Sequence, residues 1–315
     1  MLRKQGMAAL GIWILLAVCA WAAPPYKALI VDGQNGHDWK STTPVLKKLL
    51  EETKLFAVDV ATSPPKGEDM SGFKPDFAAY AVVVSNYQGD LWPAATQKAF
   101  VEYVKNGGGF VVFHFACAAF PQWKEYNEII GIGGWGGRNK ESGPLVRWRD
   151  GRAVLELEGK GPPIYAPAPK DTDIRKKRIT GYADRAGSHG PMQPFQIVIR
   201  DPKHPITKGL PEKMMHVDDE LYGWLRGPAK NLTVLATSFA PEELGGSDED
   251  EPVLFTVGYG QGRVVQVAPG HTAKELQSVA FIVLFQRAAE WAATGKVTLP
   301  APADLPTADK ASVRQ

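Results

Sequence analysis

The strongest constraint on the fold is a series of four short, strongly apolar segments within the first 115 residues. Turn residues or a helical pattern separate each segment from the next. The segments are Tyr26–Asp32, Leu55–Val60, Tyr80–Ser85 and Phe110–Phe115. Between the first two, Ser41 or Thr42 can cap a helix that has Pro44 in its first turn. A second helix is expected from Pro93 to Asn106. Repeated strand–helix–strand order predicts an α/β fold, a mainly parallel sheet with helices on both faces.

The second half of the chain has shorter strand signals and more glycine and proline. The signals are Val154–Leu157, Phe195–Ile199, Leu232–Ala236, Val253–Val257 and Val264–Ala268. An amphipathic closing helix is expected over Glu275–Trp291, ending at Gly295. We therefore expect one α/β domain over residues 23–299, whose second half elaborates the same sheet. The Pro/Ala-rich tail, residues 300–315, is expected to be extended or disordered.

The first 22 residues have the pattern of a signal peptide. A short positive region precedes the uncharged apolar run Met7–Val18, and small residues at the recognition positions predict cleavage after Ala22. The run is short for a membrane span, so we expect an exported protein, periplasmic or secreted, with no stable span after cleavage. Lipidation at Cys19 is a minor alternative, because the residue before it is a poor match.

Composition excludes two classes of protein. Lys plus Arg number 36 and Asp plus Glu 34; the predicted cleavage removes two cations and no acid, which leaves a neutral chain. A dedicated nucleic-acid binder needs a clustered positive surface, so no nucleic-acid partner is expected. The cleaved chain keeps one cysteine, Cys117, which excludes a disulfide scaffold and which we interpret as a buried apolar filler.

Three histidines stand where strands of the predicted sheet end. His37 follows the first strand, His114 closes the fourth, and His271 follows the strand Val264–Ala268. Ligands bind outside the carboxyl ends of parallel strands, so these rings are expected to converge. A histidine that closes so apolar a strand costs desolvation unless it is hydrogen-bonded, which makes His114 the strongest candidate. A satisfied core histidine is the alternative.

A fourth histidine, His216, heads a cluster of three carboxylates. Within the same short stretch, Glu220 offers an acid/base partner, and Asp219 and Tyr222 can hold substrate hydroxyls. The alternative is a solvated loop. The run Ser247–Glu251 is interpreted as a solvated loop, because it lacks the spacing of a calcium loop.

Other polar features have simpler explanations beside the functional ones. In His37-Asp38-Trp39 the side chains can bind substrate, or Asp38 caps the helix that follows. His189 and His204 lie in loops, and the second is interpreted as structural. Neither glycine-rich stretch is a nucleotide site: Gly33–Gly36 lacks the dinucleotide-binding spacing, and Gly131–Arg138 lacks the ending of a phosphate loop.

Seven segments, in a fixed order over residues 26–297, match a known family. They are Val31–Trp39, Gly107–His114, Asp201–Pro211, His216–Tyr222, Tyr259–Val264, Gly270–Thr272 and Glu290–Val297. Together they resemble the ThuA-like (trehalose-utilisation) proteins, which are similar to the class I glutamine amidotransferase-like superfamily. The resemblance implies a flavodoxin-like fold and a role in the use of trehalose and related disaccharides, including their 3-keto derivatives.

The resemblance also implies the location of an active site, but the residue at that place differs from the one that the superfamily uses. Glutamine amidotransferases have a cysteine nucleophile at the sharp turn after a strand, where this chain has His114. Cys117 comes three residues too late, and a histidine cannot form the thioester, so no glutaminase activity is expected. His271 lies near the place of the superfamily's later histidine.

Three hypotheses for the function follow. The first is an exported carbohydrate-processing enzyme that works by acid/base chemistry. Its base is His114, with His216, Glu220 and His271 as partners. Its substrate-binding residues are His37, Asp38, Trp39, Asp219 and Tyr222. Because the chain lacks a dinucleotide fingerprint, a separate sugar oxidoreductase is the expected pathway partner.

The second hypothesis is a divalent metal site. His37, His114 and His271 together can hold an ion such as zinc and leave a position open for water or a substrate carbonyl. The third is a sugar-binding accessory protein without catalysis, which needs aromatic and hydroxyl-binding groups but no reactive histidine. Tryptophan and tyrosine in the predicted edge loops, among them Trp135, suit sugar rings under either catalytic or binding hypotheses.

Overall fold

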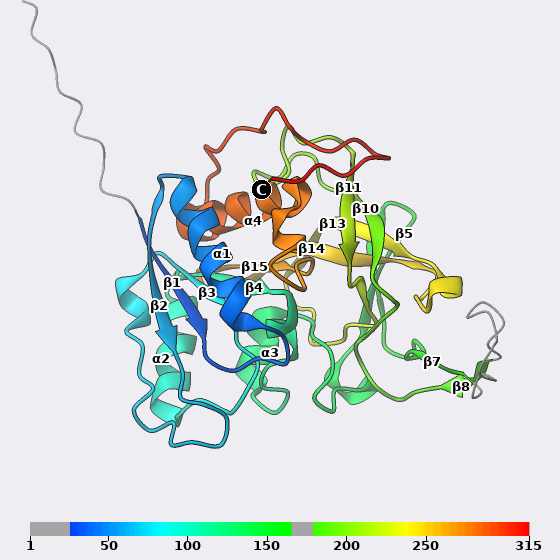
Figure 1. Ribbon diagram of the computed structural model, residues 1–315. Coiled ribbons are helices and arrows are strands. Elements are labelled where there is room, and N and C mark those ends of the chain that lie inside the picture. The colour runs from blue at the N-terminus through cyan, green and yellow to red at the C-terminus, as the bar shows by residue number, and fades with distance from the viewer. Residues whose placement is uncertain (1–25, 166–178, 315) are drawn as a thin grey trace, which may run out of the picture.

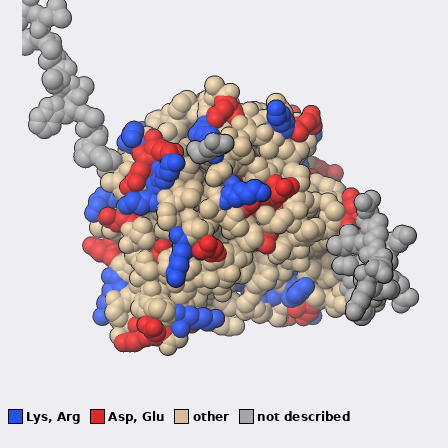
Figure 2. Space-filling view, viewed as in Figure 1, with Lys and Arg blue, Asp and Glu red and all other residues tan. Residues whose placement is uncertain are grey.

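The structure is a computed structural model that describes residues 26–165 and 179–314. The predicted signal peptide and its cleavage after Ala22 lie outside the described residues. Within the described part of the chain, no helix combines the length and apolar character that a membrane span needs. On the face drawn in Figure 2, cations and anions are interspersed over the surface.

Half of the central sheet is parallel. It has the order β15-β4-β3-β1-β2, and every neighbouring pair in it runs in parallel. The strands are β1 (Tyr26–Asp32), β2 (Phe56–Thr62), β3 (Val82–Ser85), β4 (Gly109–Phe113) and β15 (Gly262–Val267). All residues of β3 and β4 are buried, as their continuous apolar runs indicate. The five predicted segments match these strands to within two residues at each end.

Helices cover both faces of the parallel half (Figure 1). On one face α1 (Trp39–Glu52) and α4 (Val279–Thr294) pack against residues such as Ile30 and Val111. On the other, α2 (Ala94–Lys105) and α3 (Lys124–Ile130) pack against the alternate residues, such as Val31 and Val112. The two core clusters therefore follow the alternation of side chains along each strand.

The second half of the chain continues the sheet with antiparallel strands, in the order β11-β10-β13-β14-β15. They are β10 (Gln193–Ile199), β11 (Lys213–Asp219), β13 (Leu232–Ala240) and β14 (Glu249–Tyr259). The pair β5 (Leu145–Arg149) and β6 (Arg152–Glu156) branches from β14. Two small sheets complete the elaboration: β7 (Pro163–Tyr165) with β8 (Ile179–Tyr182), and β9 (Ser188–His189) with β12 (Tyr222–Gly223). The α/β fold class with an elaborated second half is confirmed.

Several local expectations differ from the structure. The first helix begins at Trp39, because the Asp38 carboxylate accepts a hydrogen bond from the backbone N–H of Ser41 and caps it. The closing helix begins at Val279 and is not amphipathic: twelve of its sixteen residues are buried between the sheet and its surroundings. Periodicity does not show this because distant segments cover the outer side of the helix: the carbonyls of Pro205 and Lys208 accept hydrogen bonds from Arg287, and His204 packs on Trp291.

The run Ser247–Glu251 is not a solvated loop. β14 begins at Glu249, and the buried Glu251 carboxylate pairs with the buried guanidinium of Arg147 and accepts a hydrogen bond from the backbone N–H of Trp224. A carboxylate this deep needs such partners, and its cation lies about a hundred residues away along the chain. Local sequence therefore could not reveal it.

The tail is extended but not disordered over residues 300–314. The backbone N–H of Val279 donates to the carbonyl of Ser312, and that of Met215 donates to the carbonyl of Thr307. Arg314 pairs with Asp304 across the tail. The tail thus straps the start of α4 and the strand β11, as Figure 1 shows in red.

Candidate functional site

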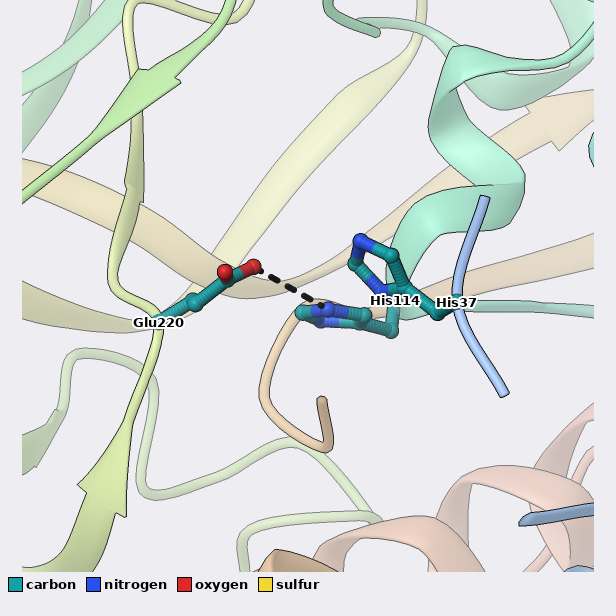
Figure 3. Close-up of side chains that lie close together, drawn as sticks. All are labelled: His37, His114 and Glu220. Atoms are coloured by element: carbon teal, nitrogen blue, oxygen red, sulfur yellow. Dashed lines mark ion pairs between the residues drawn. The ribbon is translucent and has the colours of Figure 1, made fainter. Parts of the chain in front are cut away.

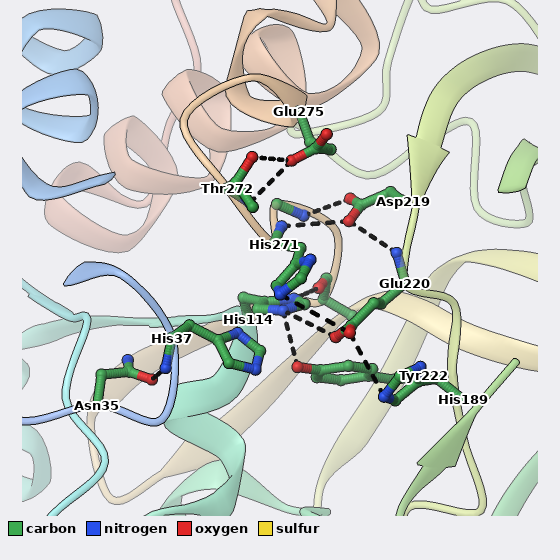
Figure 4. Close-up of polar contacts among 12 residues, drawn as sticks. Asn35, His37, His114, His189, Asp219, Glu220, Tyr222, His271, Thr272 and Glu275 are labelled. Carbon is green, nitrogen blue, oxygen red and sulfur yellow. Dashed lines mark hydrogen bonds and ion pairs between the residues drawn. The ribbon is translucent and has the colours of Figure 1, made fainter. Parts of the chain in front are cut away.

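The site lies at the carboxyl ends of β4 and β15, where loops from the antiparallel half close over them (Figure 4). β4 ends at Phe113, one residue before His114, and His114 opens the short 3-10 turn His114–Ala118 with φ of 44°. That left-handed backbone is uncommon for a residue with a side chain, and such strain concentrates at functional sites. The sharp turn aims the imidazole across the end of the sheet.

His114 has both ring nitrogens engaged. Its Nδ1 lies 2.6 Å from the carbonyl oxygen of Ala268, which can only accept, so Nδ1 carries the proton. Its Nε2 then accepts a hydrogen bond from the Tyr222 hydroxyl at 2.7 Å, and the two rings stack with centroids 4.4 Å apart. Burial raises the pKa of Tyr222 well above its ordinary value, which keeps the phenol a donor. His114 is 1% exposed.

His37 packs against two other imidazoles, tilted to one and T-shaped to the other. Its ring centroid lies 4.9 Å from that of His114 and 4.6 Å from that of His271, and it stacks on Phe115 at 4.5 Å. The Asn35 side chain accepts a hydrogen bond from the backbone N–H of His37 and fixes this loop. Burial, together with the neighbouring imidazoles, lowers the pKa of His37 to about 3, so its ring is unprotonated at neutral pH.

Glu220 is the carboxylate that these rings share. One oxygen, Oε2, lies 3.7 Å from His114 Nε2; the other, Oε1, lies 3.4 Å from His189 Nε2 and 3.7 Å from His271 Nε2. Burial raises the pKa of Glu220, but the surrounding imidazoles outweigh burial and hold it below its ordinary value. We name His37, His114, His189, His271 and Glu220 the imidazole cluster.

His216 does not join the cluster, contrary to expectation. Its ring is fully buried, with Nδ1 at 2.8 Å from the Ser278 hydroxyl and Nε2 at 2.8 Å from the Asp219 carboxylate. Asp219 in turn accepts hydrogen bonds from the backbone N–H groups of Gly270 and His271. The pair therefore holds the turn that carries His271, and Asp219 is a support behind the site rather than a residue that faces substrate.

Gly270 allows the backbone conformation of that turn. Its φ is 119°, and a Cβ added there would lie 2.6 Å from the ring of Phe113. A glycine is required for both reasons, and it lets the chain turn from β15 so that His271 faces the cluster.

The structure thus brings five of the candidates named from sequence together and leaves four apart. His37, His114, His271, Glu220 and Tyr222 meet. His216 and Asp219 lie behind the site, Asp38 is an exposed helix cap, and Trp39 begins α1 with its ring beside Lys40.

Sequence reasoning missed His189 and Phe115 as site residues. His189 reaches Glu220 because the two-residue strand β9 pairs with β12, which places it opposite Tyr222. A pairing this short leaves no sequence signal. Trp135, named among the edge aromatics, contacts the site, with its ring 4.6 Å from that of Tyr222.

The site has room for ligands of two kinds. His37, His114 and Glu220 each offer a ligand atom, and these atoms lie within 4.8 Å of one another (Figure 3). On the outer side, a cavity of about 910 Å³ borders the cluster at His189, with polar walls that include Arg185 and Asp248. In contrast, Cys117 is sealed in the core, and burial raises the pKa of its thiol to about 12, as suits a structural residue.

Comparisons with known proteins identify the family and the fold. The family model described as ThuA, trehalose utilisation, matches residues 27–292. A ThuA-like protein from Parabacteroides merdae is 42% identical, with a TM-score of 0.82, over 92% of this chain and 98% of that one. A ThuA-like protein from Bacteroides uniformis, 21% identical with a TM-score of 0.56 over 89% and 96% of the two chains, shares the fold. No curated protein matches the chain.

Proposed function

The chain belongs to the trehalose-utilisation (ThuA) family, and on that premise we propose that it is an exported enzyme that processes a trehalose- or 3-keto-disaccharide-type sugar at the imidazole cluster. The observation that carries the proposal is the meeting of four imidazoles with one carboxylate at the carboxyl edge of the parallel strands. Imidazole transfers protons near neutral pH, which is what chemistry on a sugar hydroxyl or carbonyl requires.

The roles within the cluster differ from those expected from sequence. His114, the expected base, is 1% exposed and has both nitrogens engaged, so a sugar cannot reach its ring. The imidazoles of His271 and His189 are 26% and 36% exposed, and each lies beside Glu220. We therefore assign proton transfer to His271 and His189, with Glu220 orienting both of them.

A 3-keto sugar has acidic hydrogens on the carbons beside its carbonyl. In the proposed step, the imidazole of either His271 or His189 takes one of these protons while the other imidazole, in its protonated form, gives a proton to the carbonyl oxygen, which forms an enediol with balanced charge. Glu220 lies 3.4 Å from His189 and 3.7 Å from His271, where it can orient both rings.

Aromatic side chains beside the cluster support a sugar as the ligand. The indole of Trp135 lies 5.3 Å from the ring of Phe115 and 6.4 Å from that of His189, between centroids. Aromatic faces pack on the apolar faces of pyranose rings. The cavity at His189, about 910 Å³, is large enough for a disaccharide.

Export is proposed on the pattern of residues 1–22, and a sugar oxidoreductase is proposed as the pathway partner because a 3-keto sugar must be made by oxidation. Both proposals fit an enzyme that receives its substrate outside the cytoplasm. Their direct readouts are the N-terminus of the exported chain, expected at Ala23, and conversion of trehalose only when an oxidoreductase is added.

The test is turnover by exported protein on a panel of trehalose and 3-keto-disaccharides, followed by NMR. His271→Asn is expected to lower turnover about 100-fold or more with an unchanged melting temperature, since it removes one proton-transfer group. The matched control is His204→Asn, which changes a half-buried histidine beside Trp291, away from the cluster. Equal turnover of both variants would refute the assignment, and sugar-induced stabilisation without any product would favour the accessory-protein hypothesis.

A further inference from the structure

We propose that His37, His114 and Glu220 form a binding site for a divalent transition-metal ion, zinc or a similar first-row ion, on the inner side of the imidazole cluster (Figure 3). Binding of the ion is independent of the proposed sugar chemistry, and only the ion's role in turnover rests on it.

The first observation is the spacing of the ligand atoms. His114 Nε2 and Glu220 Oε2 are 3.7 Å apart, which two bonds of about 2.0–2.2 Å to one ion can span. All three ligand atoms lie within 4.8 Å of one another. Ligand atoms of a tetrahedral site with such bonds lie about 3.4 Å apart, so binding requires these atoms to close by up to about 1.4 Å through side-chain rotation.

The second observation is the tautomer of His114. Its Nδ1–H donates to the carbonyl of Ala268, so Nε2 carries the lone pair. That lone pair accepts a hydrogen bond from the Tyr222 hydroxyl, and an ion bound to Nε2 would replace this hydrogen bond. Metal-binding histidines are held in this way, with the second nitrogen donating to a backbone carbonyl or a carboxylate. The left-handed backbone at His114 fixes the direction of the ring further.

The third observation is a set of buried polar atoms without partners. Within the part of the chain that the structure describes, His37 Nδ1, Glu220 Oε2 and His271 Nδ1 are buried and make no hydrogen bond. Buried polar atoms are nearly always satisfied, and these three belong to side chains that meet in the imidazole cluster. One bound cation would engage ring nitrogens and carboxylate together.

The chemical types of the three ligands indicate which ion the site prefers. Two imidazoles and one carboxylate suit zinc and its first-row neighbours, whereas calcium and magnesium prefer all-oxygen sites. Three protein ligands would leave at least one position open, and the partly exposed His271 lies beside two of the ligands, Glu220 and His37. In the proposed function that position would take an oxygen of the sugar, where the ion acts as a Lewis acid.

The test uses untagged full-length mature protein, stripped with a chelator and titrated with Zn²⁺ by calorimetry and with Co²⁺ by visible absorption. We expect one ion per chain. His37→Asn and Glu220→Gln are each expected to weaken the binding about 100-fold or more, while the control His204→Asn leaves it unchanged. The melting temperature of each variant shows whether it folds. If one of the two cluster variants does not fold, the other still tests whether the cluster binds the ion.

Each outcome bears on one proposal. No stoichiometric ion, or binding that both cluster variants leave intact, overturns the metal site. An ion bound without turnover of any sugar on the panel supports the metal site and counts against the proposed function. Full turnover by chelated protein that binds no ion supports the proposed function and overturns this inference.

Discussion

Hydrogen-bond partners decide what each buried histidine can do. His114 and His216 are both sealed from solvent. The ring of His114 lies between the Ala268 carbonyl and the Tyr222 phenol, within the cluster. The ring of His216 lies between Ser278 and Asp219, away from it. Those partners lie up to 154 residues away along the chain. The two histidines therefore play opposite roles: one is part of the site, and the other supports the turn of His271.

At this scale we predict that Asp219→Asn lowers the free energy of unfolding by about 3 kcal/mol. The fully buried carboxylate accepts hydrogen bonds from His216 and from three backbone N–H groups, and an amide cannot replace a charged acceptor there. The control is its exposed neighbour, Asp218→Asn, expected to change stability by less than about 0.5 kcal/mol. Urea denaturation measures both, and similar small effects would contradict the support role.

A strand or helix could be predicted from the sequence where its own residues have a recognisable hydrophobic pattern. The strands β1, β3 and β4 are continuous apolar runs in the sequence, so the parallel half of the sheet could be predicted. The convergence of His37, His114 and His271 at its edge followed from that prediction. β11 could not, because its polar residues point to alternate sides and some are buried against the tail and α4. The position of His189 depends on pairing with Tyr222, which no local pattern encodes.

The tail provides the element-scale prediction. A chain that ends at Leu299 loses the hydrogen bonds to Val279, Met215 and Gln277 and the packing of Leu305 on the core. At about 1 kcal/mol for each hydrogen bond, the melting temperature should fall by roughly 4–8 °C. Arg314→Gln, which breaks only the exposed pair with Asp304, is the control and should shift it far less. Scanning calorimetry measures both melting temperatures. If the truncated chain and the Arg314→Gln variant melt at the same temperature, the tail does not stabilise the fold.

The central sheet is continuous, and its parallel and antiparallel halves meet at the site. Loops after parallel strands supply His37, His114 and His271, the end of β11 is followed by Glu220, and the small sheet of β9 and β12 supplies His189. One core cluster also runs through both halves, from Ile30 and Val111 to Leu235 and Leu254. A ligand that bridges the cluster should therefore stabilise both halves together, because neither half contains the whole site.

This coupling is measurable with the proposed ion. Zn²⁺ at about 100 times its Kd should raise the free energy of unfolding by about 2.7 kcal/mol. Amides in β1, β3 and β4 and in β10, β13 and β14 that exchange through global unfolding should then slow by the same factor, about 100-fold. The Glu220→Gln variant, which binds the ion about 100-fold more weakly, should gain no more than about 0.4 kcal/mol and about twofold protection under the same conditions. Protection confined to the parallel strands would mean that the halves unfold separately, since a ligand protects only the unit whose opening releases it.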